Sequence, residues 1–176
     1  MEMTAAYDER IALALVQRDR VCRIRLCLPT LRLSRLLRVI DEEYPILEYL
    51  IMDPLKDNYD ALMLPEALQV QHLYHLMLIG FTLPIGSKLL TTALDLVTLY
   101  MQFSFDFLPT VLLVWLSSMP QLETLDIGYF EEHYDDWDEV ERQHIHILPT
   151  PTQIILPNLR RFGFRVLALT WKCLFL

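Results

Sequence analysis

A short motif of apolar residues recurs along the chain, and this recurrence limits the possible folds more than any other feature of the sequence. The motif has apolar residues at its first, fourth and sixth positions, and its six copies begin at residues 21, 47, 73, 96, 122 and 159. The intervals are 26, 26, 23, 26 and 37 residues. Leucine-rich repeats have periods of 20 to 29 residues. The sequence therefore predicts stacked repeats with one insertion.

Each copy ends in an alternation of apolar and other residues, which is typical of a strand with one buried face. Between copies the spacing is often helical, as in Ser34 to Glu43 and in Leu108 to Met119. Strands that are each reached by a crossover must run parallel. We expect an α/β fold, a leucine-rich-repeat solenoid with about six parallel strands on its concave face and helices or irregular turns on its convex face.

Three prolines, Pro45, Pro120 and Pro157, stand two residues before the first leucine of a copy. Because a proline cannot continue a helix, we expect each one to stop the preceding segment and to set an extended entry into the strand. A leucine-rich chain can produce one copy of the motif by chance. Six copies at nearly constant spacing, three of them with the proline, favour a true repeat.

The pattern divides the chain into three regions. These are a helix at 1–17 as a candidate cap, a leucine-rich-repeat domain at 18–165 with an acidic insertion at 129–152, and an apolar tail at 166–176 that looks like a truncated repeat. The insertion reads most simply as a solvated loop. The functional alternative is an acidic docking segment with Tyr134 and Trp137 as anchors.

Charge, cysteine content and hydropathy exclude several classes of protein. A net charge of −8 argues against nucleic-acid binding, which needs clustered cations. The longest apolar stretch, Phe107 to Leu116, is far shorter than the ~20 residues that span a bilayer, so no membrane segment is expected. Three cysteines without a CxxC pair and a start that lacks a secretory signal favour an intracellular location, cytoplasmic or nuclear.

Catalytic motifs are missing from the sequence. Gly80 to Lys88 departs from a phosphate-binding loop, because five residues separate its glycines and Ser87 precedes Lys88. His72 and His75 lie three apart and would point to opposite faces of a strand, which suits a shared metal poorly. His144 and His146 make a weak pair within the insertion. We therefore predict no enzyme, no cofactor and no metal site.

The residues between the apolar positions of each strand should line the exposed concave face. The middle of this face is apolar and aromatic and its outer strands carry arginines, which suits a protein or peptide client. The simpler alternative is that these residues merely occupy exposed positions. The candidate binding residues are Arg23, Arg25, Tyr49, Asp53, His75, Met77, Tyr100, Thr124, Asp126, Arg161 and Arg165.

Several phrases of the sequence resemble the leucine-rich part of the large fungal family of F-box proteins with leucine-rich repeats. They include DRVCRIRL, EEYPILEYLIM, LLVWLSSMPQLETLDI and ILPNLRRFGFR, and the resemblance covers roughly Arg18 to Arg165. It implies a substrate-recruiting solenoid within a cullin-based ubiquitin ligase. The first 17 residues have room for one helix and not for an F-box, so a ligase adaptor is expected as a partner only if an F-box exists elsewhere.

The alternative to a client-binding module is a truncated or vestigial family member without independent activity. The tail after the last motif copy carries one charge, Lys172, and has no polar stripe. Exposed apolar surface of this kind favours association between chains. We expect self-association through Phe164, Leu167, Leu169, Trp171, Leu174 and Phe175.

Overall fold

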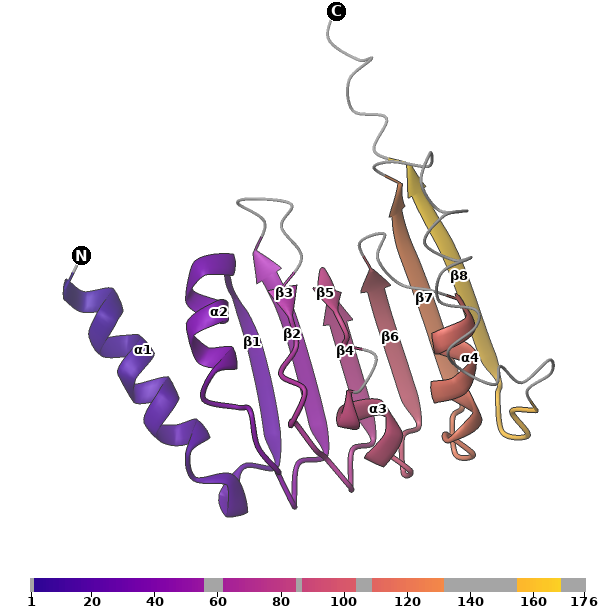
Figure 1. Ribbon diagram of the computed structural model, residues 1–176, viewed down its shortest axis with the longest axis horizontal. Helices are drawn as coiled ribbons and strands as arrows, with labels where there is room; N and C mark the ends of the chain where they lie inside the picture. Colours follow the sequence, from indigo (N-terminus) through magenta and orange to yellow (C-terminus); the bar gives the residue numbers. More distant parts are fainter. Residues whose placement is uncertain (1, 56–61, 85–86, 104–108, 132–154, 169–176) are drawn as a thin grey trace, which may run out of the picture.

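Six parallel strands, one from each copy of the motif, form the sheet that dominates the computed structural model (Figure 1). The structure describes residues 2–55, 62–84, 87–103, 109–131 and 155–168. The sheet strands, in spatial order, are β1 (Arg23–Pro29), β2 (Tyr49–Leu55), β4 (His75–Ile79), β6 (Thr98–Phe103), β7 (Thr124–Glu131) and β8 (Arg161–Ala168). Spatial order follows chain order, and this confirms the predicted α/β fold with six parallel strands.

The remaining elements are short. The helices are α1 (Glu2–Leu15), η1 (Arg18–Arg20, a 3-10 turn), α2 (Thr30–Leu37), α3 (Lys88–Thr92) and α4 (Pro109–Ser117). Strands β3 (Leu62–Met63) and β5 (Phe81–Thr82) pair in a separate two-stranded sheet. None of the described helices is both long and apolar enough to cross a membrane.

The register of the sheet places equivalent motif positions side by side. The fourth motif position forms one row across all six strands, made up of Ile24, Leu50, Leu76, Leu99, Leu125 and Phe162. From Ile24 to Leu125 this row is buried, whereas Phe162 on the last strand is 64% exposed. The alternation in the sequence thus identified the buried face of the first five strands.

Four of the strands are entered through the same β-turn. Backbone amides donate across it from Leu47 to Tyr44, Leu96 to Ala93, Leu122 to Met119 and Leu159 to Leu156. In three of the four turns a proline occupies the second position, where its fixed φ suits the turn. The prolines therefore act as turn residues immediately before the extended entry that the sequence analysis expected.

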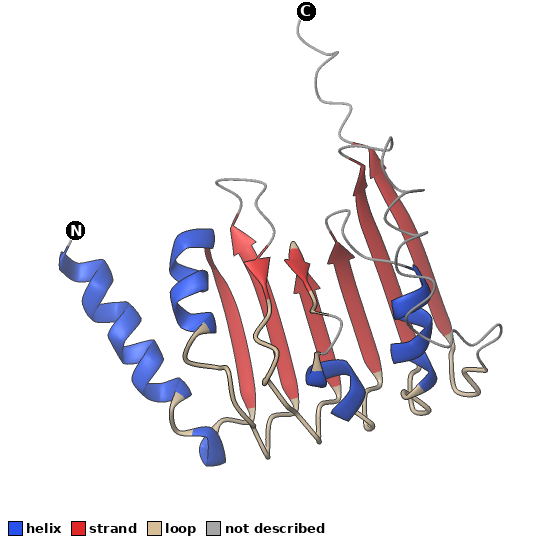
Figure 2. Ribbon diagram, in the orientation of Figure 1, coloured by secondary structure: helices blue, strands red, loops and turns tan. Residues whose placement is uncertain are grey.

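Helices α2, α3 and α4 all cover the same face of the sheet (Figure 2). Each contributes apolar side chains to a continuous core. The fully or nearly buried helix residues are Leu33, Leu36, Leu37, Leu89, Leu90, Leu112, Trp115 and Leu116. Burial of these helix side chains against the strand leucines drives the folding of the sheet. It contributes roughly 25 cal/mol per Å² of apolar surface removed from water.

Helix α2 differs from the expected helix at Ser34 to Glu43, because it starts at Thr30 and ends at Leu37. The residues that follow bond to the next repeat instead of continuing the helix. The Tyr44 amide donates to the Gln69 carbonyl at 2.9 Å, and the Gln69 amide donates to the Glu42 carbonyl at 3.3 Å. These bonds take the backbone groups that a longer helix would have used.

Strands β7 and β8 continue beyond the boundaries drawn from the sequence. Their ladder pairs Tyr129 with Val166 and Glu131 with Ala168, so the first residues of the expected insertion and tail are strand residues. The rest of the insertion and the tail from residue 169 lie outside the described residues. Tyr134, Trp137, His144 and His146 belong to that undescribed part.

Candidate binding face

The face of the sheet opposite the helices, here called the open face, carries the side chains that alternate with the core residues. The register aligns them in three rows. The first row is Arg23, Tyr49, His75, Thr98, Thr124 and Arg161, and the second is Arg25, Ile51, Met77, Tyr100, Asp126 and Gly163. The third pairs Cys27 with Asp53 and aligns Ile79, Gln102, Gly128 and Arg165.

All eleven candidate residues therefore lie on this face, because each is a member of one of the three rows. From β1 to β8, the types of side chain follow one another as the sequence analysis expected. Arginines stand on the two outer strands, and aromatic and apolar residues stand between them. The structure brings the candidates together as a surface rather than as a compact cluster around one point.

Three residues of the first row stack against one another. The rings of Tyr49 and His75 lie parallel, with centroids 4.4 Å apart and an interplanar angle of 10°. The Arg23 guanidinium lies 6.0 Å from the centroid of the Tyr49 ring, a cation–π distance. Burial lowers the pKa of His75 below its usual 6.5, so a neutral imidazole is favoured within the stack.

A second group joins the last two strands. Arg165 donates to Oδ2 of Asp126 at 2.6 Å, while Oδ1 of Asp126 is buried and has no hydrogen-bond partner. Gly163 lies beside Asp126 in the second row. A Cβ atom at Gly163 would stand 2.9 Å from the Asp126 Cγ, closer than such atoms approach in proteins. The carboxylate thus occupies space that only glycine leaves open.

The middle of the open face is more closed than the alternation alone indicates. Ile51 is 7% exposed and Gln102 is 9% exposed, although the sequence placed both among the surface positions. Met77 and Tyr100 are half-buried and present part of their side chains to solvent. The accessible centre therefore consists of Met77 and Tyr100.

The described residues of the open face supply charged, aromatic and apolar side chains. Within the ranges that the structure describes, no group of three or more His, Cys, Asp or Glu side chains could hold a metal ion. His72 lies at the start of its repeat, outside the rows, with its Nδ1 3.1 Å from Oδ2 of Asp95. His75 belongs to the aromatic stack, so the two histidines have separate surroundings.

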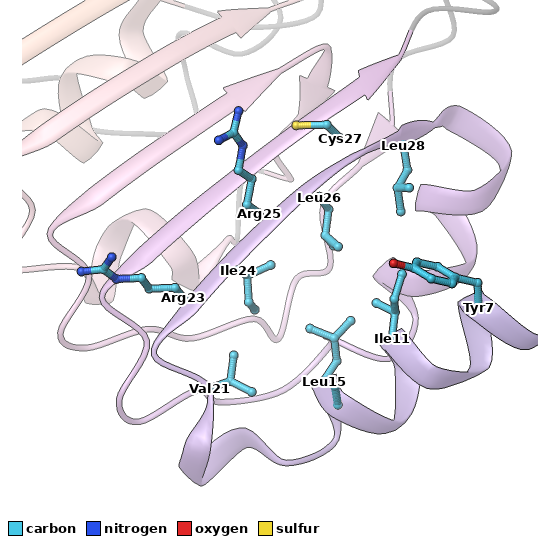
Figure 3. Close-up of a pocket in the computed structure, with 11 residues that line it drawn as sticks. Tyr7, Ile11, Leu15, Val21, Arg23, Ile24, Arg25, Leu26, Cys27 and Leu28 are labelled. Atoms are coloured by element: carbon cyan, nitrogen blue, oxygen red, sulfur yellow. The ribbon is translucent and has the colours of Figure 1, made fainter.

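The sequence analysis missed a pocket beside the open face. It lies between α1 and β1, has a volume of about 600 Å³ and is lined by Tyr7, Ile11, Ala14, Leu15 and residues of Val21 to Leu28 (Figure 3). The sequence did show an N-terminal helix before the first strand. It held no signal for how closely the two would pack, because this depends on tertiary contacts.

Comparisons of the chain with protein-family models, with curated proteins and with solved structures find no significant match. The function is therefore inferred from the geometry and chemistry of the chain.

Proposed function

We propose that the chain is a leucine-rich-repeat module that binds a protein or peptide client on the open face of its sheet. The observation that carries this proposal is the set of three aligned rows, in which an aromatic and apolar centre lies between arginine-bearing outer strands. Arginine, tyrosine and methionine are enriched at protein interfaces, and lysine and glutamate are depleted there. The strands of the open face follow that composition.

The repeated geometry of the strand entries supports the leucine-rich-repeat assignment. From β2 to β8, two successive amides at each junction donate to the carbonyl of the residue just before the preceding strand. The amides of Tyr74 and His75 donate to the Glu48 carbonyl, and those of Val97 and Thr98 donate to the Tyr74 carbonyl. The carbonyls of Val97 and Glu123 each accept two amides in the same way. This repetition of one backbone unit along the sheet supports the proposal of a solenoid.

The size of the open face also suits a macromolecular client. Six strands at a spacing of about 4.8 Å make a face about 24 Å wide. A surface of this width exceeds what a small metabolite would cover. A protein surface or an extended peptide can contact all three rows at once.

Co-purification with a matched pair of variants tests the proposal. The open-face variant is Tyr49→Ala/Tyr100→Ala, and the control is Leu31→Ala, which changes an exposed residue on α2. Circular dichroism first verifies that both variants fold. We expect a client that is retained by the wild type and the control and is lost from the open-face variant. Identical partners in all three samples, or chaperones alone, would contradict the proposal.

Within this proposal, the module serves as the substrate-recognition part of an F-box-type ubiquitin ligase. The support is the sequence resemblance over the repeats. Helix α1 is a single helix, so this step of the proposal requires an F-box elsewhere for the adaptor to bind. Immunoprecipitation of the endogenous protein tests this step, with a cullin adaptor as the expected partner. Client binding without any adaptor would refute the ligase role and leave the binding module in place.

A further inference from the structure

The free edge of β1 has the properties of a peptide-binding site. Strand β1 pairs with β2 on one side, and it is the first strand of the sheet. In a parallel ladder, alternate amide and carbonyl groups of an edge strand point away from its only partner. No described strand pairs with this edge of β1. It therefore presents backbone donors and acceptors that an added strand could use.

The pocket of about 600 Å³ lies along this edge. Figure 3 shows Ile24, Leu26 and Leu28 pointing from β1 toward Ile11 and Leu15 of α1, so apolar side chains line the side of the pocket that faces α1. Its volume falls within the range of 300 to 1,000 Å³ that is common for ligand pockets. The apolar side chains of a bound segment could fill it.

The opposite side of the same strand is positively charged. Arg23 and Arg25 also line the pocket, and their side chains extend away from α1, onto the open face (Figure 3). No ion pair joins either arginine to an acidic side chain in the described part of the chain. A strand added to the edge would place every second side chain beside them, where acidic residues would be stabilised as opposite-charge cross-strand pairs.

We propose that an extended peptide with alternating acidic and apolar residues binds to the β1 edge by adding a seventh strand to the sheet. Its backbone pairs with β1, its apolar side chains enter the pocket under α1, and its acidic side chains face Arg23 and Arg25. This division of roles, with main-chain bonds for affinity and side-chain pockets for specificity, is general in strand addition. The site does not depend on client binding at the open face.

A single peptide fits this edge better than a second copy of the chain. Figure 1 places α1 and α2 on the β1 side of the sheet, and the edge is reached through the pocket that residues of α1 and β1 line. An extended peptide needs only that space. The β1 strand of another copy would bring its own α1 into the same region.

The test uses the full chain and a fluorescein-labelled nine-residue peptide in which glutamate and leucine alternate. Two control peptides have the same composition, one with its glutamates and leucines in separate blocks and one with alternate backbone amides methylated. Anisotropy should show binding of the first peptide, with at least tenfold weaker binding of both controls. Hydrogen exchange should slow at the β1 amides when the peptide is bound.

Protein variants locate the site. Ala14→Trp places a large side chain in the pocket from an exposed helix position, and Leu13→Trp makes the same change at an exposed position outside the pocket lining. We expect Ala14→Trp and Arg25→Glu to weaken binding at least tenfold and Leu13→Trp to leave it unchanged. Unchanged binding by Ala14→Trp, equal binding of the blocked peptide, or no binding at all would overturn the proposal. So would a dimer of the wild type that Ala14→Trp converts to a monomer, since the edge would then belong to a second copy.

Discussion

At the scale of single residues, adjacent positions in one strand have opposite surroundings. Leu76 is fully buried in the core, and its neighbour Met77 lies on the open face. Replacing a buried leucine with alanine removes apolar contacts and leaves a cavity, which costs about 2 to 5 kcal/mol. We expect Leu76→Ala to lower the free energy of unfolding by this amount in urea titrations and Met77→Ala to lower it far less. Equal losses would show that the register is wrong.

Gly163 and Asp126 should behave as a coupled pair. A Cβ at Gly163 would displace the Asp126 carboxylate from Arg165, so we expect Gly163→Ala to destabilise the protein. In the Asp126→Ala background the same substitution should cost much less, because the obstructing carboxylate is gone. A double-mutant cycle measured by urea unfolding gives the coupling. Additive effects would mean that Gly163 is required for another reason.

The stack of His75 on Tyr49 predicts a pH dependence of stability. Burial lowers the pKa of folded His75 below the value of about 6.5 in the unfolded chain, so the unfolded state binds protons first as the pH falls. The contribution of the neutral imidazole to the free energy of unfolding is fully present above about pH 6.5 and is lost as the pH falls below this value. We expect His75→Gln to lose less stability than the wild type between pH 7 and pH 5.

His72→Gln is the matched control for this pH series, because His72 is exposed and lies outside the stack. Its free energy of unfolding should fall with pH as steeply as that of the wild type. If His75→Gln also followed the wild-type slope, burial of His75 would not be the source of the pH dependence.

At the scale of elements, one buried hydroxyl links α1 to the repeats. Tyr44 donates a hydrogen bond to the Leu15 carbonyl at 3.0 Å, at the end of α1. Tyr44→Phe removes this bond and leaves a buried carbonyl, which should cost about 1 kcal/mol. Hydrogen exchange should also speed up in α1. Tyr74→Phe, at an exposed tyrosine, is the control, and equal changes in both variants would contradict this role of Tyr44.

The sequence predicted the sheet strands better than the segments between them. Strand positions follow from a period of two within a period of about 26, and both periods are visible in the leucines. The extent of α2 was predicted less well, because Glu42 and Tyr44 bond to Gln69 of the next repeat. Strands β3 and β5 are two residues each and leave no pattern to detect. Residue propensities and the period of the apolar residues do not reveal hydrogen bonds between repeats that compete with the extension of a helix.

The open face was predictable from the same period of two. Once the buried positions of a strand are known, the alternate positions are assigned to the open face. The alternation correctly placed Arg23, Tyr49 and His75 in one row. It did not reveal that Ile51 and Gln102 are buried, because exposure depends on the packing of side chains from adjacent strands. The pocket at the β1 edge was missed because it arises from the packing of α1. The self-association through the tail remains a prediction, since most of those residues lie outside the described ranges.

At the scale of the whole molecule, each strand of the six-stranded sheet pairs with the strands of that sheet that come before and after it in the chain. The helices cover one side of this array, and the other side is the open face (Figure 2). A ligand that contacts several repeats must therefore lie across the rows. The two proposed sites share Arg23 and Arg25, because the client lies across the rows of the open face and the peptide extends the sheet at its β1 edge.

Site-specific photo-crosslinking tests the central claim most directly, because it reports which face a client touches. A benzophenone amino acid is placed at Tyr100, in the centre of the open face, or at exposed Leu31 on α2, and the cells are irradiated. We predict a discrete protein adduct from position 100 that position 31 does not give. Adducts only from position 31, or the same adducts from both positions, would contradict client binding on the open face.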